Sequence, residues 1–308
     1  MAMRSSVPPL ALIAGPTASG KSALALALAE RTGGVIVNAD SAQVYRDIPV
    51  LSAAPSPADR DRAEHRLYGV IDGASPCSAA DWAQMAKAEI ADVQSAGKLP
   101  ILVGGTGMYI RTLLDGIAPV PQIDGAIRAD VRAAATDENY RRLRELDSEA
   151  ADRLNAADTT RIARALEVVL STGRPLREWQ MQRIGGIADR VLLRPLLLLP
   201  PREWLYERCD ERFPAMVGQG ALDEVRVLLE RGLDPRLPVM RAIGVPELSS
   251  CLRQDLDNSE AILAAQQSTR RYAKRQYTWF ANQCPPYWPR IEAAVDNGVI
   301  AAALRALS

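Results

Sequence analysis

Histidine, cysteine and phenylalanine are scarce in this chain of 308 residues, which contains one, four and two of them, respectively. The cysteines stand far apart and form no C-x-x-C pair, so the sequence offers too few ligands for a zinc site. We interpret the cysteines as small buried hydrophobic residues, since disulfides are rare in the cytoplasm, where we expect this protein. The single histidine, His65, lies outside the predicted binding loops, and we expect it to be structural.

Net charge and long apolar runs are also missing. The chain carries 37 basic and 37 acidic residues, so any binding of nucleic acid must come from local patches. The apolar segment at residues 191–199 is interrupted by Arg194 and Pro195, and no run reaches the length of a membrane span. No signal-peptide pattern is present at the N-terminus. These absences predict a cytoplasmic protein without membrane contact, and the lack of an association motif predicts a monomer.

What the sequence does contain is a phosphate-binding loop near its start. Residues 15–22 read GPTASGKS and match G-x-x-x-x-G-K-[ST] at every fixed position. A buried strand is predicted before the loop, and a helix of strong formers after it. The helix N-terminus and Lys21 would bind a diphosphate or triphosphate, and Ser22 is placed to hold Mg²⁺. The predicted binding residues are Gly15, Pro16, Thr17, Ala18, Ser19, Gly20, Lys21 and Ser22. The loop alone leaves open whether phosphate is transferred or discarded.

The order of predicted elements indicates an α/β fold with a P-loop NTPase-like parallel sheet flanked by helices. Strands are expected at residues 10–14, 35–37, 99–103 and 191–199, and a helix at 81–96. Residues 120–186 are charge-rich and helical, and we interpret them as a helical insertion domain that grips a substrate. The core domain then comprises residues 1–119 and 187–308, with a mostly helical C-terminal part.

Polar segments follow two further predicted strands. Asp40, Ser41 and Gln43 come after one strand, and Thr106 stands between glycines after another. Ligands of open α/β sheets bind at the carboxyl ends of strands, so these segments and the phosphate loop should share one crevice. Asp40 is interpreted as a metal-holding carboxylate or a general base, with capping of the next turn as the structural alternative. Gln43 offers a donor and an acceptor for the edge of a base.

Basic side chains gather in three helical segments. In the insertion, Arg161 and Arg164 share one helix face, an arrangement suited to a phosphate backbone or to solvent. Arg208 and Arg212 lie one helical step apart and could clamp phosphate oxygens or pair with the acids between them. Residues 270–275 place four cations, Arg270, Arg271, Lys274 and Arg275, in one arc, which we interpret as an RNA or diphosphate contact. The aromatic residues of that helix, from Tyr272 to Phe280, are expected to pack it.

Together these segments resemble the tRNA dimethylallyltransferase family, the tRNA isopentenyltransferases or IPP transferases that prenylate adenosine 37 of tRNA. The matching segments are GPTASGKS at 15–22, DSAQVYRD at 40–47, LVGGTGMYI at 102–110, TRIARALEV at 160–168 and YAKRQYTWF at 272–280. The first motif is generic, whereas the second, third and fifth together are specific. They keep the family's order over nearly the whole chain.

The resemblance implies attack by the adenine N6 amine on dimethylallyl diphosphate, with diphosphate as the leaving group. Asp40 would be the catalytic base, and Thr17 and Lys21 would stabilise the leaving group together with Ser22 and Mg²⁺. Thr106 would support the acceptor side, and Arg212 the diphosphate. Together with the basic helix, the predicted contacts to the anticodon stem-loop are Asp40, Ser41, Ala42, Gln43, Thr106, Arg128, Thr160, Arg161, Ile162, Ala163, Arg164, Arg241, Lys274 and Arg275.

One segment departs from the family pattern. The family commonly reads Arg-x-x-Gly-Tyr-Arg where this chain has RAIGVP at residues 241–246, so Val245 and Pro246 remove a donor and a cation. Arg241 and Gly244 remain. Three other activities share parts of the pattern: a small-molecule P-loop kinase, an adenylate isopentenyltransferase and a nucleic-acid-binding ATPase.

Overall fold

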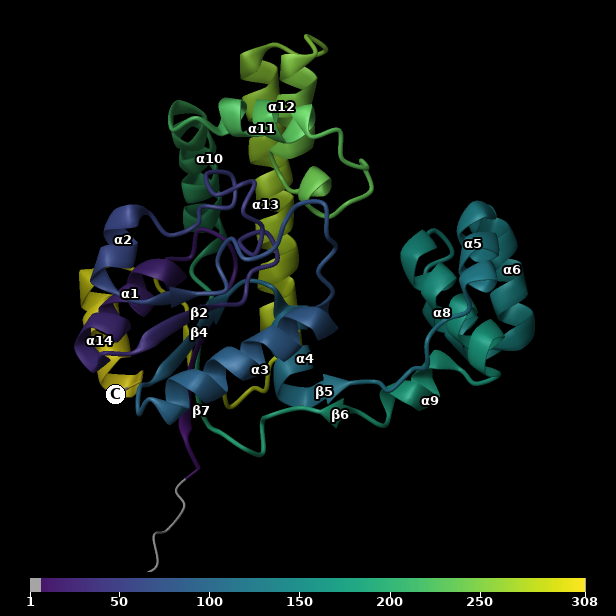
Figure 1. Ribbon diagram of the computed structural model, residues 1–308, viewed down its shortest axis with the longest axis horizontal. Helices are drawn as coiled ribbons and strands as arrows, with labels where there is room; N and C mark the ends of the chain where they lie inside the picture. The colour runs from purple at the N-terminus through teal and green to yellow at the C-terminus, as the bar shows by residue number, and fades with distance from the viewer. Residues whose placement is uncertain (1–6, 308) are drawn as a thin grey trace, which may run out of the picture. The chain divides into compact units, whose positions relative to one another are not determined.

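The computed structural model describes residues 7–307. The described chain divides into two compact units (Figure 1). One unit takes the residues up to Leu113 together with those from Ile187 onward, and the other is Leu114–Gly186. Among residues 7–307, no helix combines the length and the apolar character that crossing a bilayer requires.

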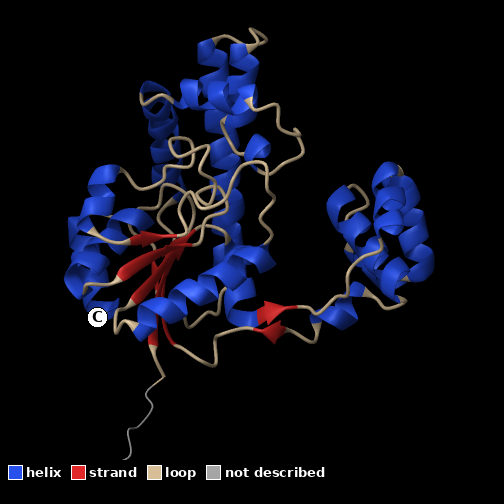
Figure 2. Cartoon of the chain, viewed as in Figure 1, coloured by secondary structure: helices blue, strands red, loops and turns tan. Residues whose placement is uncertain are grey.

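A six-stranded sheet forms the centre of the first unit, with the order β3-β2-β4-β1-β7-β8 and parallel pairing throughout (Figure 2). Its central strands are buried apolar runs, as expected when helices cover both faces of a parallel sheet. The strands are β1 (Pro9–Ala14), β2 (Val35–Asn38), β3 (His65–Arg66), β4 (Pro100–Gly104), β7 (Leu192–Leu198) and β8 (Arg290–Ile291). The strands predicted at residues 10–14, 35–37, 99–103 and 191–199 are therefore confirmed, whereas β3 and β8 were not predicted.

Register brings the loops after the central strands to one edge of the sheet. Ala14, the last residue of β1, pairs with Gly104 of β4 on one side and Leu197 of β7 on the other. On the far side of β4, Asn38 of β2 pairs with Val103. The segments that follow β1, β2, β4 and β7 therefore start next to one another, where open α/β sheets bind their ligands.

Helices cover both faces of the sheet (Figure 1). On one side, α1 (Lys21–Thr32) packs against α14 (Asn297–Leu307), and its buried leucines share one hydrophobic core with Ile13 and Ile101. On the other side lies α3 (Ala79–Ser95), which begins with a capping box formed by Ser78 and Asp81. Its Trp82 is fully buried and donates a hydrogen bond to the carbonyl of Asn38 at the end of β2.

Most of the remaining helices of this unit lie beyond the carboxyl edge of the sheet (Figure 1). The longest is α13, which runs along α10, and α12 packs against both α11 and α13 (Figure 1). Their bounds are α2 (Pro57–Arg62), α4 (Gly107–Asp115), α10 (Arg202–Gly218), α11 (Ala221–Glu230), η1 (Val239–Arg241), α12 (Val245–Leu252) and α13 (Asn258–Gln283). α10 follows β7 directly, so its residues are carried over the same edge of the sheet as the phosphate loop.

The second unit is a small helical body with its own core. Ile162 and Leu166 of α8 are fully buried against Val131 and Leu143 from neighbouring helices. Its elements are β5 (Gly116–Ile117), α5 (Gly125–Ala133), α6 (Thr136–Leu146), α7 (Ser148–Arg153), α8 (Thr159–Thr172), α9 (Leu176–Gln180) and β6 (Ile184–Gly185). β5 and β6 pair antiparallel, so the unit begins at Leu114, ahead of residue 120. The predicted α/β class with a helical insertion is confirmed.

Candidate active site

The phosphate loop lies over the end of the neighbouring strand β7. Gly15 has φ 155°, and a Cβ at this position would lie 2.3 Å from the carbonyl oxygen of Leu198, so the close approach requires glycine. Residues Thr17 to Ser22 line a pocket that we call the loop pocket. It also contains Asp40 and Gln43 from the segment after β2, and Arg208, Glu211 and Arg212 from α10. The phosphate loop and the segment after β2 therefore share one crevice, as predicted, and from β4 only Val103 and Gly104 line it.

Lys21 is the cation of the loop itself. Its Nζ donates a hydrogen bond to the carbonyl oxygen of Pro16 at 2.5 Å, which folds the side chain back over the loop. Desolvation lowers the pKa of Lys21 from 10.5 to about 8, while the negative charge of Asp40 opposes the shift and the positive charge of Arg212 adds to it. Lys21, Asp40 and Arg212 are therefore close enough for the charge of Asp40 to affect the pKa of both cations.

Two arginines of α10 contact the loop directly. Arg208 Nε donates to the carbonyl oxygen of Ala18 at 3.1 Å, and Arg212 Nη1 donates to Thr17 Oγ1 at 3.0 Å. Burial lowers the pKa of Arg212, and the charge of Asp40 opposes this effect. The alternative of ion pairs within α10 does not describe these two residues, because Asp210 pairs with Arg270 of α13 instead.

Asp40 lies where the loop pocket meets a second pocket. Its backbone N–H donates to Asn38 Oδ1 at 2.8 Å, and its own Oδ1 accepts from the N–H of Ala42 at 2.9 Å. The turn after β2 is thereby fixed on both sides of the carboxylate, and the expected capping role is real. The same side chain lines both pockets, so the capping contact leaves it accessible from each of them.

The second pocket, here called the apolar pocket, adjoins the loop pocket. Its apolar wall includes Ile48, Leu51, Phe213, Met216 and Ile243. Its polar lining includes Thr17, Asp40, Ser41, Arg212, Arg241, Tyr272 and Arg275. Thr17, Asp40 and Arg212 therefore border both pockets, and they mark the place where an anionic group and an apolar group of one ligand would join.

Thr106 supports this site without lining either pocket. Its Oγ1 accepts a hydrogen bond from the N–H of Ser41 at 2.9 Å and donates one to Ser41 Oγ at 3.2 Å. Burial raises the pKa of Tyr272, and hydrogen bonds to Thr106 and Ser41 oppose that shift. Thr106 thus acts through Ser41, which lines the apolar pocket beside Ala42.

The side-chain amide of Gln43, which was expected to contact a base, binds a neighbouring loop through its nitrogen. Its Nε2 donates to the carbonyl oxygens of Ser52 at 3.1 Å and Ala53 at 2.8 Å. These bonds fold residues 52–54 against the loop pocket, which Gln43 also lines. Both hydrogen bonds of the amide nitrogen therefore go to the backbone, and a contact of Gln43 with the edge of a base stays a prediction.

The basic residues of α13 do not act as one group. Arg275 is exposed and lines the apolar pocket, together with Arg241 from η1, and Lys274 is exposed. Arg270 instead forms an ion pair with Asp210, so the four cations of the predicted stripe are not equally available for a contact. Tyr272, which was expected to pack the helix, also lines the apolar pocket.

In the helical unit, the residues predicted to contact RNA divide by burial. Arg128, Thr160 and Arg161 are exposed, and burial lowers the pKa of the half-buried Arg164. Ile162 and Ala163 are buried in the core of the unit, so a side-chain contact with RNA is wrong for both. A buried carboxylate, Glu167, accepts a hydrogen bond from Arg132 at 2.8 Å and lies 3.9 Å from Arg164.

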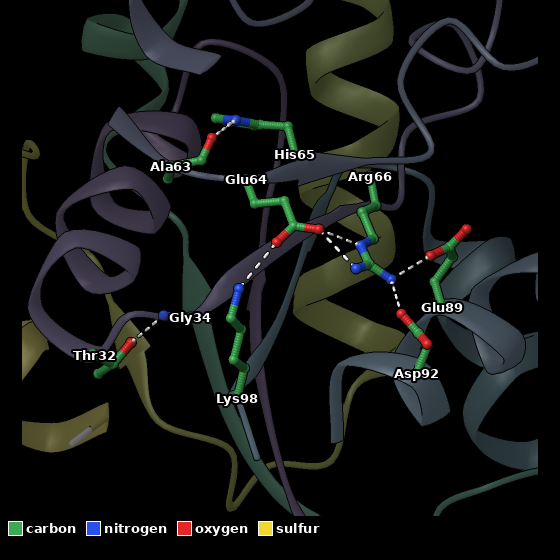
Figure 3. Close-up of polar contacts among 9 residues, drawn as sticks. All are labelled: Thr32, Gly34, Ala63, Glu64, His65, Arg66, Glu89, Asp92 and Lys98. Atoms are coloured by element: carbon green, nitrogen blue, oxygen red, sulfur yellow. Dashed lines mark hydrogen bonds and ion pairs between the residues drawn. The ribbon is translucent and has the colours of Figure 1, made fainter. Parts of the chain in front are cut away.

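His65 starts β3 and is placed by structural contacts. Its Nδ1 lies 2.8 Å from the carbonyl oxygen of Ala63, and its ring meets that of Tyr68 edge to face. Figure 3 shows the adjoining network, in which Arg66 contacts Glu64, Glu89 and Asp92. Lys98, which also pairs with Glu64, precedes β4. The network therefore ties β3 to α3 and to the segment before β4, and none of its residues lines the loop pocket.

Several residues of the site were not predicted. Gln276 contacts both the phosphate loop and the segment after β4, and Trp279 packs against Gly107. The sequence signal that could have indicated Gln276 is that it is an uncharged glutamine within a basic, aromatic helix.

The two residues that depart from the family pattern lie in the first turn of α12. Val245 is buried, and Pro246 is exposed. All four cysteines are free thiols.

Comparisons with known proteins agree with this geometry. The family model described as IPP transferase matches residues 43–283. A tRNA dimethylallyltransferase of Erythrobacter litoralis is 58% identical over 290 residues, which cover 92% of each chain. One of Sphingopyxis alaskensis is 58% identical over 282 residues, covering 91% of this chain and 92% of the other.

Solved structures give the same picture. The full-length tRNA isopentenylpyrophosphate transferase from Bacillus halodurans superposes with a TM-score of 0.70 at 30% identity, covering 96% of this chain and 94% of the other. A eukaryotic dimethylallyltransferase acting on tRNA superposes with a TM-score of 0.77 at 28% identity, covering 89% of this chain and 70% of the other.

Proposed function

The chain belongs to the IPP transferase family, and we propose that it transfers a dimethylallyl group from dimethylallyl diphosphate to N6 of adenosine 37 in tRNA. The observation that carries the proposal is that Thr17, Asp40 and Arg212 border both the loop pocket and the apolar pocket. A donor with an anionic head and a short branched tail fits this pair of pockets. Its head would lie against the loop amides and its tail among the apolar side chains.

The reaction joins the N6 nitrogen to the allylic C1 carbon while the bond from C1 to the diphosphate oxygen breaks. The electron pair of the broken bond leaves with diphosphate, and the N6 proton passes to the carboxylate of Asp40. Because N6 is a poor nucleophile, orientation and stabilisation of the leaving group must supply most of the rate enhancement. Asp40 borders both pockets, so its carboxylate would lie near the junction of the donor's head and tail, where C1 reacts.

Stabilisation of the leaving diphosphate falls to Lys21, Arg212 and the N–H groups at the start of α1. Ser22 lines the loop pocket beside Lys21, so its hydroxyl would hold Mg²⁺ together with oxygens of the diphosphate. Residues 7–307 contain no cluster of three or more His, Cys, Asp or Glu that would bind the ion without the substrate. When bound, Mg²⁺ neutralises charge on the departing group.

The tRNA would approach from the open side of the apolar pocket. Arg241 and Arg275 line that pocket and offer contacts to phosphates flanking the acceptor base, and exposed Lys274 extends them along α13. Arg128, Arg161 and Arg164 of the helical unit supply further cations for the anticodon stem-loop. We propose a monomeric cytoplasmic enzyme.

Three alternatives make different demands on this site. A small-molecule kinase would use the loop pocket but would have no need for the adjoining apolar pocket. An adenylate isopentenyltransferase would use both pockets but not the arginines of the helical unit. A nucleic-acid-binding ATPase would hydrolyse ATP without prenyl transfer.

One assay separates these activities. The protein is incubated with labelled dimethylallyl diphosphate and Mg²⁺, with either undermodified tRNA or AMP as acceptor, and separately with ATP alone. We expect label in tRNA at adenosine 37, stoichiometric release of diphosphate, and little or no label in AMP. Label in AMP alone would overturn the tRNA proposal, and phosphate release from ATP without prenyl transfer would favour the ATPase.

A further inference from the structure

Gln276 of α13 joins two of the strand-end segments that form the active site. Its Oε1 accepts a hydrogen bond from the N–H of Thr17 at 2.7 Å, and its Nε2 donates one to the carbonyl oxygen of Gly105 at 2.8 Å. The side chain is 5% exposed, so water does not compete for either bond. A primary amide carries one acceptor and one donor group at its end, which is what this pair of backbone groups requires.

The segment after β4 is shaped to receive this helix. A Cβ on Gly105 would lie 2.3 Å from Gln276 Nε2, and a Cβ on Gly107 would lie 2.3 Å from a ring carbon of Trp279. Gln276 and Trp279 are three residues apart and so share one face of α13. Two glycines of the GGTG segment therefore leave space for two side chains of one distant helix.

The two polar atoms of the Gln276 side chain bind segments on different sides of the proposed active site. Thr17, held through its N–H, accepts a hydrogen bond from Arg212 on its hydroxyl, on the side of the leaving diphosphate. Gly105, held through its carbonyl, precedes Thr106, which fixes Ser41 beside Asp40 on the acceptor side. One buried amide thus spans the donor and acceptor halves of the site.

We propose that Gln276 is a positioning residue that sets the separation between the diphosphate side and the base side of the active site. This inference rests on the proposed function. Gln276 lines neither pocket, so its effect would pass through the backbone of Thr17 and Gly105. Because a misplacement of about 1 Å can cost about 100-fold in rate, loss of the bridge should lower kcat far more than substrate affinity.

The first experiment compares Gln276→Met, which keeps length and volume but loses both bonds, with Gln266→Met. Gln266 is the matched control, since it lies on the same helix and its Nε2 donates to the backbone of Asp210 at 2.8 Å, outside both pockets. We expect Q276M to lower kcat by about 100-fold with dissociation constants for tRNA and pyrophosphate changed less than about threefold. Wild-type kcat in Q276M would overturn the inference, as would equal losses in kcat and both affinities.

A second experiment uses Gly105, whose substitution by alanine should displace Gln276. In the cycle of G105A, Q276A and the double variant, we expect the two losses in kcat to be strongly non-additive, because both remove the same bridge. Additive losses would show that the two residues act separately and would overturn the inference.

Amide hydrogen exchange tests the bridge without any activity. The peptide containing Thr17 should exchange faster in Q276M than in the wild type, and Q266M should leave it unchanged. Unchanged exchange in Q276M would overturn the bridge itself. If exchange responds as expected but the wild type transfers no prenyl group, the proposed function fails while the bridge remains established.

Discussion

Arg212 Nη1 donates a hydrogen bond to Thr17 Oγ1 at 3.0 Å, joining residues 195 positions apart in the chain. The contact arises because β7 pairs with β1, so that α10, which follows β7, passes over the loop that follows β1. Thr17 also donates its N–H to Gln276, which brings a third segment to the same residue. The loop is therefore held in shape from outside before any diphosphate binds.

Replacement of Arg212 should remove a charge that stabilises the leaving group. We expect Arg212→Ala to lower kcat for prenyl transfer by about 100-fold or more, in line with the loss of one donor aimed at developing negative charge. Arg226→Ala is the matched control, since Arg226 of α11 is an exposed arginine paired with Asp223. Steady-state kinetics with varied dimethylallyl diphosphate measure the effect. A rise in KM with unchanged kcat would instead assign Arg212 to uniform substrate binding.

Substitution of Asp40 tests the proposed base. Asp40→Asn keeps an oxygen that can accept from the N–H of Ala42, so the turn after β2 should survive. We expect transfer to fall by about 100-fold to 10,000-fold, with the dissociation constant for tRNA nearly unchanged. Single-turnover prenyl transfer and filter binding measure the two quantities. Asp61→Asn, on the exposed surface of α2, is the control, and retained transfer by D40N would remove Asp40 from the base role.

Much of the sheet could be predicted because its central strands are buried apolar runs. β1, β2 and β4 give this signal along most of their length, and β7 gives it in its last three residues. Two-residue strands such as β3 and β8 carry no periodic pattern, and only pairing with a neighbour defines them. The resemblance of the five motifs to the IPP transferase family is confirmed.

Site residues could be predicted where they come directly after a strand of the parallel sheet. Asp40 and the phosphate loop are examples, because parallel strands end at one edge whatever the remaining chain does. Which side chain of a distant helix reaches that edge depends on tertiary packing. Gln276 faces the loop while its neighbour Arg275 lines the apolar pocket, and the sequence pattern does not distinguish these orientations. Ile162 shows the reverse error, since it lies in a matching motif but packs in a core.

Salt dependence should distinguish the cations of α13. If Lys274 and Arg275 contact phosphates, Lys274→Ala and Arg275→Ala should each reduce the slope of log affinity for tRNA against log salt by about 0.7 to 0.9. Arg270→Ala, on the same helix, should leave the slope unchanged because Arg270 pairs with Asp210. Binding measured between low and moderate salt tests this contrast. Equal slopes for all variants and the wild type would assign Lys274 and Arg275 to solvent.

The lowered pKa of Lys21 predicts two opposite effects of pH. In the native protein this pKa is about 8, against 10.5 ordinarily, so between these values the unfolded chain binds the additional proton. The contribution of Lys21 to the free energy of unfolding should therefore rise with pH across that window. Binding of pyrophosphate, which needs the charged ammonium, should weaken by up to about tenfold per pH unit above about 8.

Lys21→Met separates these effects from other titrations. Calorimetric affinity for inorganic pyrophosphate and urea unfolding are measured from pH 7 to 10 for the wild type, K21M and the control Lys87→Met on α3. The ligand's own ionisation contributes equally to all three proteins, so the difference between wild type and K21M isolates the lysine. We expect that difference in affinity to shrink as pH rises through about 8, while the difference in stability changes in favour of the wild type. Parallel curves for the wild type and K21M would contradict a lysine that loses its charge in this range.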